Sequence, residues 1–151
     1  MELHLIAHNI RSRENVGALF RTCDSLGVAK LWLTGYTPAP PDSKISKVGL
    51  GAEASVRWEQ RVRVEDALDE LKAQGVQVYA LELTEGAVEL SSFQPPGRMA
   101  FLLGTETTGL PPSLIERCDG AVSIKQHGTK ESLNVTIAAA IASWAVLNRK
   151  A

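Results

Sequence analysis

The feature of the sequence that most constrains the fold is a long uncharged run near its end. No residue from Leu133 to Asn148 carries a charge. A helix over this run must be covered by protein nearly all round, because a solvent-facing side normally carries polar residues. The run is too short to cross a bilayer, and Arg149 and Lys150 end it. The fold therefore has to surround this segment with other parts of a protein.

The residues that open this run are polar. Ser132 and Asn134 bring a hydroxyl and an amide to the first helical turn, where backbone N–H groups are free and the helix dipole is positive. This arrangement suits a ligand site with a polar floor and an apolar wall. Taken alone, however, these residues favour an N-cap serine before an ordinary buried helix.

Short apolar segments alternate with segments of helical periodicity along the rest of the chain. We expect strands at residues 3–7, 29–34, around 56–58, 76–81, 99–103 and 121–124, and helices at residues 16–26, 43–49, 64–74 and 111–118. Residues 82–98 read as a surface loop with one turn near residues 90–93. The alternation predicts an α/β fold with a largely parallel sheet flanked by helices.

Composition narrows the class of protein. A chain of 151 residues with 44 % hydrophobic residues and a net charge of −1 fits one globular domain over residues 1–151, with no evident tail or linker. No signal or transit peptide is recognisable. Cys23 and Cys118 have no metal-type spacing and are interpreted as buried thiols, which favours a reducing cytoplasm. Residues 1–63 carry an excess of basic side chains that suits phosphate or a plain solvated surface equally well.

Three polar, glycine-bearing stretches follow predicted strands, at residues 9–17, 104–111 and 125–134. Ligands of parallel α/β sheets gather at the carboxyl ends of strands, so these stretches together indicate a binding site. None of them contains a dinucleotide fingerprint or a P-loop, which argues against a Rossmann dinucleotide enzyme and an NTPase.

Individual polar residues are less informative. Glu106, alone between threonines, is compatible with a plain surface carboxylate. The three histidines have no serine or aspartate at a recognisable triad spacing, so hydrolysis by a nucleophile gains no support. Arg21 lies about 170° from the centre of the apolar face of its predicted helix, from 3.6 residues per turn. It therefore points away from the core.

Three segments of the chain match a known family pattern. Asn15 to Thr22, Phe101 to Pro111 and Ser132 to Val135 resemble, in the same order, the three motifs of the SpoU/TrmH-type RNA 2′-O-ribose methyltransferases of the SPOUT superfamily. The resemblance implies an S-adenosylmethionine-dependent enzyme, a homodimer with its active site between subunits, and a deep C-terminal trefoil knot. We expect a single methyltransferase domain over residues 1–151 with no added RNA-binding domain, which fits the members of the family that methylate tRNA as bare dimers. tRNA is therefore the expected substrate and ribosomal RNA the alternative, and neither a metal nor a membrane is expected.

The resemblance also implies the site residues. The matching functional positions are Asn15, Arg21, Glu106, Ser132 and Asn134, and the cofactor pocket is expected at Leu81, Gly104, Ile124, Ser132 and Leu133. Lys125 and Gln126 stand where the family often has Pro-Met, and Thr105 stands where it commonly has Asn or Pro. We expect Arg21 to hold the target phosphate as a fork and Glu106 to orient Arg21 or Asn15, because arginine keeps its proton in proteins.

Two other classes of protein share parts of this pattern. One is a non-catalytic RNA-binding protein that keeps the fold. The other is an α/β nucleotide-binding enzyme unrelated to methylation. The five functional matches weigh against both, and binding of S-adenosylmethionine separates them from a methyltransferase.

Overall fold

A computed structural model describes residues 1–130 and 132–149; Glu131, Lys150 and Ala151 lie outside the described residues. In chain order the elements are β1 Glu2–His8, α1 Arg13–Leu26, β2 Lys30–Thr34, α2 Ser43–Gly49, β3 Trp58–Arg61, α3 Val64–Ala73, β4 Gln77–Leu81, β5 Val88–Glu89, β6 Arg98–Leu103, α4 Pro112–Glu116, β7 Gly120–Ser123 and α5 Val135–Leu147. Single 3₁₀ turns lie at Ala52–Ala54 and Leu90–Ser92.

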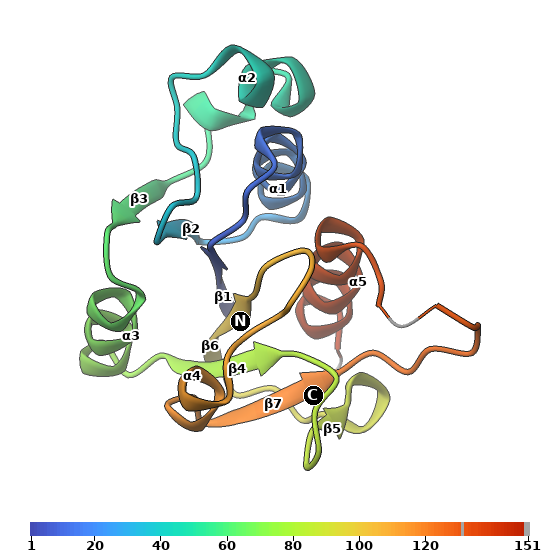
Figure 1. Cartoon of the computed structure of the whole chain (residues 1–151). Coiled ribbons are helices and arrows are strands. Elements are labelled where there is room, and N and C mark those ends of the chain that lie inside the picture. Colours follow the sequence, from blue (N-terminus) through green and yellow to red (C-terminus); the bar gives the residue numbers. More distant parts are fainter. Residues whose placement is uncertain (131, 150–151) are drawn as a thin grey trace.

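The strands form one parallel sheet in the order β3-β2-β1-β6-β4-β7-β5. Leu3, Leu5 and Ala7 of β1 face the core that contains α1 and α5, whereas Ile6 faces the core that contains α3 and α4. Figure 1 shows α1 and α5 beside each other. The predicted α/β fold with a parallel sheet flanked by helices is confirmed.

Helix α1 begins earlier than its apolar periodicity indicated. It starts at Arg13 instead of residue 16, because the Ser12 side chain caps it by accepting a hydrogen bond from the Asn15 N–H. Its end is as predicted: Gly27 has φ +71° and its N–H donates to the Cys23 carbonyl. The polar loop after β1 is therefore shorter than expected, and Asn15 lies in the first turn of a helix.

Two sheet-edge elements differ from the sequence prediction. Strand β3 lies at Trp58–Arg61 and not around residues 56–58, and β5, at Val88–Glu89, falls within the stretch expected to be loop. Both are edge strands of the sheet, and both β5 residues are exposed. Edge strands need no apolar alternation, so the hydrophobic pattern carries little signal for them.

Helix α5 corrects two expectations. Its N-cap is Asn134 and not Ser132. Within one chain it is not covered all round, since Ile137, Ile141 and Trp144 are 51 %, 42 % and 60 % exposed. Its covered face consists mostly of small side chains: Ala139, Ala142, Ser143 and Val146. The chain thus leaves one side of its most apolar helix bare.

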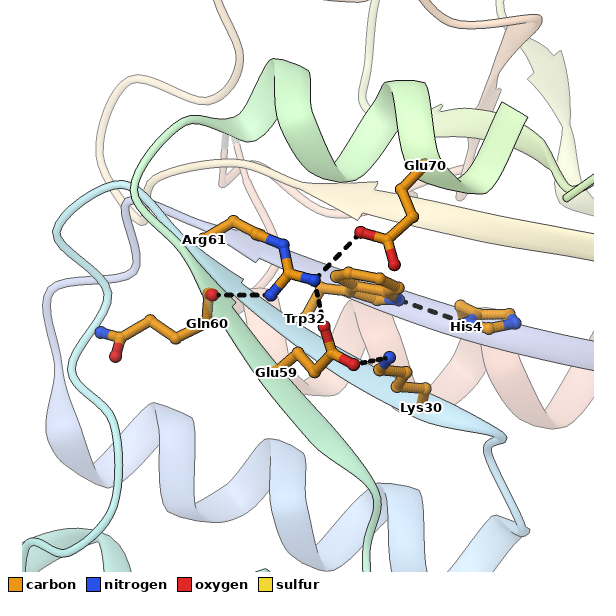
Figure 2. A network of polar contacts seen from close by, with 7 residues as sticks. All are labelled: His4, Lys30, Trp32, Glu59, Gln60, Arg61 and Glu70. Carbon is orange, nitrogen blue, oxygen red and sulfur yellow. Dashed lines mark hydrogen bonds and ion pairs between the residues drawn. The ribbon is translucent and has the colours of Figure 1, made fainter. Parts of the chain in front are cut away.

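A polar network fixes the β2–β3 edge of the sheet (Figure 2). The fully buried Trp32 ring lies 4.1 Å from Lys30 Nζ and 5.4 Å from Arg61 Cζ. Glu59 pairs with both cations, and Arg61 Nη2 also lies 3.0 Å from Glu70 of α3. Trp32 Nε1 donates to His4 Nδ1 at 3.2 Å, and burial lowers the pKa of His4. His4 therefore has a structural role.

Two further observations concern the whole chain. Among the described residues, no helix is both long enough and apolar enough to cross a membrane. The trefoil knot that the family resemblance implies stays a prediction.

Candidate functional site

Two adjoining cavities open where β4, β6 and β7 end and α5 begins. They measure about 210 and 260 Å³ and share the lining residues Leu81, Glu82, Ser132, Leu133 and Ala138. Their combined volume lies within the range of roughly 300–1,000 Å³ that is usual for small-molecule binding pockets. Their position at the carboxyl ends of parallel strands is the one expected for ligands of this fold class.

All five positions expected for the cofactor pocket line these cavities. Leu81, Ser132 and Leu133 contact both, Gly104 lines one, and Ile124 lines the other. They come from the ends of three strands and from the segment before α5. Gln126, which stands where the family often has methionine, also lines the cavity that contains Ile124. The structure thus brings together residues that are up to 52 positions apart.

The loop from Gly104 to Leu110 forms one wall and depends on two glycines. A Cβ at Gly104 would lie 2.7 Å from the Gly109 carbonyl carbon and 2.8 Å from the Leu110 nitrogen. A Cβ at Gly109, which has φ +69°, would lie 2.6 Å from Glu82 Oε2. Thr105 closes the loop by accepting a hydrogen bond from the Thr108 N–H at 3.1 Å. Backbone can therefore approach a ligand here without intervening side chains.

Glu82 is a site residue that the sequence did not reveal. It follows β4, lines both cavities, and accepts a hydrogen bond from the Leu110 N–H at 3.0 Å. Sequence reasoning assigned it to a surface loop. The one feature of the sequence that could have indicated Glu82 is its position directly after a predicted strand, at the end where ligands of such sheets bind.

Glu106 connects the Gly104–Leu110 loop to the start of α1. Its carboxylate accepts hydrogen bonds from the Arg11 and Ser12 N–H groups, both at 3.0 Å, and from the Asn15 amide at 3.4 Å. Partial burial raises the pKa of Glu106, but these hydrogen bonds outweigh burial, so the pKa lies below its ordinary value. Glu106 therefore stays ionised and holds Asn15 beside the cavities.

Asn134 holds the start of α5. Its Oδ1 accepts hydrogen bonds from the Thr136 and Ile137 N–H groups at 2.9 and 3.3 Å, and from the Thr136 hydroxyl at 2.6 Å. These bonds satisfy backbone donors that a helix start leaves free. Ser132 and Leu133 immediately precede this cap, so Asn134 positions the segment that lines both cavities.

Arg21 lies apart from this group. It is exposed, as its helical position predicted, and lines an apolar groove of about 550 Å³ between α1 and α5. The other lining residues are Ala18, Thr22, Ser25, Leu26, Ala140, Ile141 and Trp144. Within residues 1–130 and 132–149, Glu106 bonds to Asn15 and forms no ion pair with Arg21. The single chain therefore assembles Asn15, Glu106, Ser132 and Asn134 near one another but leaves Arg21 in a separate groove.

The cysteines and possible metal ligands add little to the site. Both thiols are free, and burial raises the pKa of Cys23 to about 12 and that of the half-buried Cys118 to about 11. Neither thiol is a reactive nucleophile. In the part of the chain that the structure describes, no group of three or more His, Cys, Asp or Glu side chains is arranged to hold a metal ion.

Comparison with known proteins identifies relatives over almost the whole chain. A family model described as the SpoU rRNA Methylase family matches residues 2–144. The 23S rRNA (guanosine-2′-O-)-methyltransferase RlmB of Neisseria meningitidis serogroup B is 32 % identical over 137 residues. That match covers 91 % of this chain and 54 % of the relative, so the chain spans about half the length of this curated protein.

Solved structures agree with this assignment. The AdoMet-bound rRNA methyltransferase from Sinorhizobium meliloti superimposes with a TM-score of 0.89 and 27 % identity, covering 96 % of this chain and 55 % of that one. A structure concerned with 2-OH methylation of C/U34 on tRNA gives a TM-score of 0.86 and 25 % identity. In that case the match covers 96 % of this chain and 93 % of the other.

Proposed function

Because the chain belongs to the SpoU rRNA methylase family, we propose that it transfers a methyl group from S-adenosylmethionine to a ribose 2′-hydroxyl of RNA. The observation that carries the proposal is the convergence of Leu81, Gly104, Ile124, Ser132 and Leu133 on one pair of cavities. Among relatives, the Sinorhizobium rRNA methyltransferase is an AdoMet-bound structure. On this proposal, the cofactor binds and the methyl group is transferred at the same end of the sheet, where the strands end.

The residues around the cavities fit this cofactor. Leu81, Ile124 and Leu133 supply apolar surface for an adenine ring, and the loop at Gly104 offers close backbone approach. The carboxylates of Glu82 and Glu106 line the same space, which favours a cationic ligand. When bound, S-adenosylmethionine supplies the electrophilic methyl group.

The protein's part in the reaction is to position the ribose hydroxyl and to balance charge. Glu106 holds Asn15 at the edge of the cavities, and Asn134 holds Ser132 in place through the cap of α5. Arg21 is the fork for the target phosphate and for the charge that develops on the ribose oxygen, and it keeps its own proton throughout. The proton leaves by way of phosphate or water.

We propose further that two chains form the working enzyme. The bare face of α5, made by Ile137, Ile141 and Trp144, adjoins the groove that Arg21 lines. Contiguous exposed apolar surface of this kind is typical of protein interfaces. A second copy covering this face explains why Arg21 does not meet Asn15 and Glu106 within one chain. In the dimer, Arg21 of one chain serves the cavities of the other.

For the substrate we favour tRNA over ribosomal RNA. The chain is similar over 96 % of its length to a structure concerned with 2-OH methylation of C/U34 on tRNA. Free cysteines suit the cytoplasm, where we expect the reaction to occur.

Two assays test this proposal. Calorimetry should detect binding of S-adenosylmethionine. In the second assay, the protein should transfer labelled methyl groups to unmodified tRNA transcripts in preference to ribosomal RNA fragments. Mapping of the modified nucleotide should place the methyl group on a ribose 2′-oxygen. Binding of RNA without binding of the cofactor would support a non-catalytic RNA-binding protein. Binding of neither would support an unrelated nucleotide enzyme.

A further inference from the structure

A third cavity lies on the other side of the Thr105–Thr108 turn. It measures about 240 Å³ and is lined by Arg11, Tyr36, Thr105, Glu106, Thr107 and Thr108. The last four residues also line the cofactor cavity described above. The two spaces therefore share one thin wall, and a group bound in the third cavity lies next to the proposed reaction site.

Tyr36 is an unusual residue for this surface. Of the eight aromatic side chains of the chain, only Tyr36 and Trp144 are more than half exposed. Trp144 belongs to the bare face of α5, for which a second chain is the proposed partner. Tyr36, which is 54 % exposed, lies outside that face and lines the cavity beside Glu106.

The backbone at Tyr36 is firmly held. Its N–H donates to Asn9 Oδ1 at 3.1 Å, and Asn9 adopts φ +54°. Gly35 precedes it at φ +65°, where a Cβ would lie 1.8 Å from Asn9 Oδ1. Thr37 follows it, with a buried hydroxyl that donates to the Ala7 carbonyl at 2.9 Å. A turn held by these hydrogen bonds thus presents a half-exposed aromatic ring.

Arg11 completes one wall of this cavity. Its Cζ lies 5.8 Å from the centre of the Tyr36 ring, and its backbone N–H donates to Glu106. Within residues 1–130 and 132–149, its guanidinium forms no ion pair. In proteins that bind single-stranded RNA, an aromatic ring stacks on a base that is not base-paired, and a neighbouring guanidinium neutralises the adjoining phosphate. Thr105, Thr107 and Thr108 line the same cavity, and threonine hydroxyls can hydrogen-bond to base edges.

We propose that this cavity holds an unpaired base of the RNA, within one nucleotide of the methylated ribose, stacked on Tyr36 and flanked by Arg11. The inference rests on the proposed methyltransferase function and adds a positioning residue to it. Tyr36 lines neither of the two cofactor cavities. It acts by fixing the RNA strand on the far side of the shared wall.

The test compares Tyr36→Leu with Tyr36→Phe. Leucine keeps apolar bulk but has no ring face, whereas phenylalanine keeps the ring and loses only the hydroxyl. Stacking of one base is worth about 1–3 kcal/mol, or about 5- to 150-fold. Tyr36→Leu should raise the KM for the tRNA transcript by that factor with little change in kcat or in S-adenosylmethionine affinity. Tyr36→Phe should stay within about twofold of the unchanged protein.

Val62→Ala is the matched control, because Val62 is 85 % exposed and its carbonyl accepts a hydrogen bond from the Gly35 N–H, but it lines no wall of this cavity. It should leave the RNA KM unchanged. An unchanged KM in Tyr36→Leu, or an equal loss in Tyr36→Phe, would overturn the stacking site while the unchanged protein still methylates RNA. Absence of cofactor binding and methyl transfer in the unchanged protein would instead overturn the proposed function.

Discussion

Helices α3 and α5 pack on opposite faces of the same sheet, yet their outer faces differ completely. α3 buries Val64, Ala67, Leu68 and Leu71 and turns charged residues such as Asp66 and Lys72 outward. α5 buries mainly small side chains and turns Ile137, Ile141 and Trp144 outward. A helix that faces water carries polar residues on that side, so α5 has the composition of a helix with protein on both sides.

The same contrast divides the candidate active site. One part, at the ends of β4, β6 and β7 and the start of α5, is assembled within one chain, where Glu106, Asn15, Ser132 and Asn134 lie around two cavities. The other part is the groove between α1 and α5, where Arg21 lies next to the exposed side chains of Trp144 and Ile141. We therefore regard the cofactor cavity as complete in one chain and the RNA-phosphate site as complete only in two.

The largest expected effect comes from placing a charge on the bare face of α5. Trp144→Asp should convert the proposed dimer to monomer, because a tryptophan at the centre of an interface can contribute more than about 2 kcal/mol to it. Methyl transfer should fall with it. Lys72→Asp on the solvent face of α3 is the control and should change neither. Sedimentation velocity measures the oligomeric state of both variants. A Trp144→Asp protein that remains dimeric and active would contradict an interface formed by the bare face of α5.

A smaller effect on folding, with a large effect on activity, is expected for Asn134→Ala. Loss of an N-cap side chain costs about 1 kcal/mol and releases the segment that carries Ser132 and Leu133. Activity should fall far more than in Cys23→Ala or Cys118→Ala, whose thiols have only packing to lose. Circular dichroism establishes folding and methyl-transfer rates establish activity. Equal activity losses in all three folded variants would show that the site is misplaced.

The pH dependence of stability should reveal the charge on Glu106. Because its folded pKa lies below the ordinary value of 4.5, its ionised form stabilises the folded state. This contribution is fully present above the unfolded pKa and is lost as pH falls through the depressed folded pKa. Glu106→Gln should therefore destabilise the protein at neutral pH and show a flatter decline below about pH 5 in thermal unfolding. Parallel curves for both proteins would contradict this role.

The smallest effect on stability is expected at Arg21. Since the side chain is exposed, Arg21→Lys and Arg21→Ala should change the free energy of unfolding by about half a kcal/mol and leave cofactor binding intact. If Arg21 is a phosphate fork, lysine keeps the charge but not the geometry, so Arg21→Lys should recover only part of the activity that Arg21→Ala loses. The pH–rate curve of Arg21→Lys should then be lower than that of the unchanged enzyme and parallel to it. A steep rise of the lysine variant toward full rate at high pH would instead identify a base.

The sequence predicted much of the fold because most strands and helices have buried apolar patterns. Residues 99–103 of β6 are an unbroken apolar run, and residues 3–7 of β1 are apolar except for His4. Both strands lie in the middle of the sheet, so their burial follows directly. β3 and β5 lie at the edges, where the residues are partly or fully exposed and show no such pattern. The same reasoning failed for the surroundings of α5, because the sequence shows that a helix needs covering but not which molecule covers it.

The site was predictable in part and for a different reason. The five cofactor-pocket positions were implied by family motifs, and residue spacing alone gives no reason for Leu81 and Ser132 to line one cavity. Glu82 and Tyr36 were missed because each stands in a polar, turn-like stretch where the sequence has no periodicity. Their importance depends on distances across the chain, such as that from Glu82 to the Leu110 N–H.

The most direct test of the divided site is a mixture of two inactive variants. Arg21→Ala keeps an intact cofactor cavity, and Asn134→Ala keeps an intact Arg21. If each active site combines Arg21 of one chain with the cavities of the other, random mixed dimers contain one complete site. Co-refolding the two variants in equal amounts should then restore about a quarter of the unchanged methyl-transfer rate, from the symmetry of a two-chain interface. No recovery, with mixed dimers verified by mass spectrometry, would contradict an active site shared between chains.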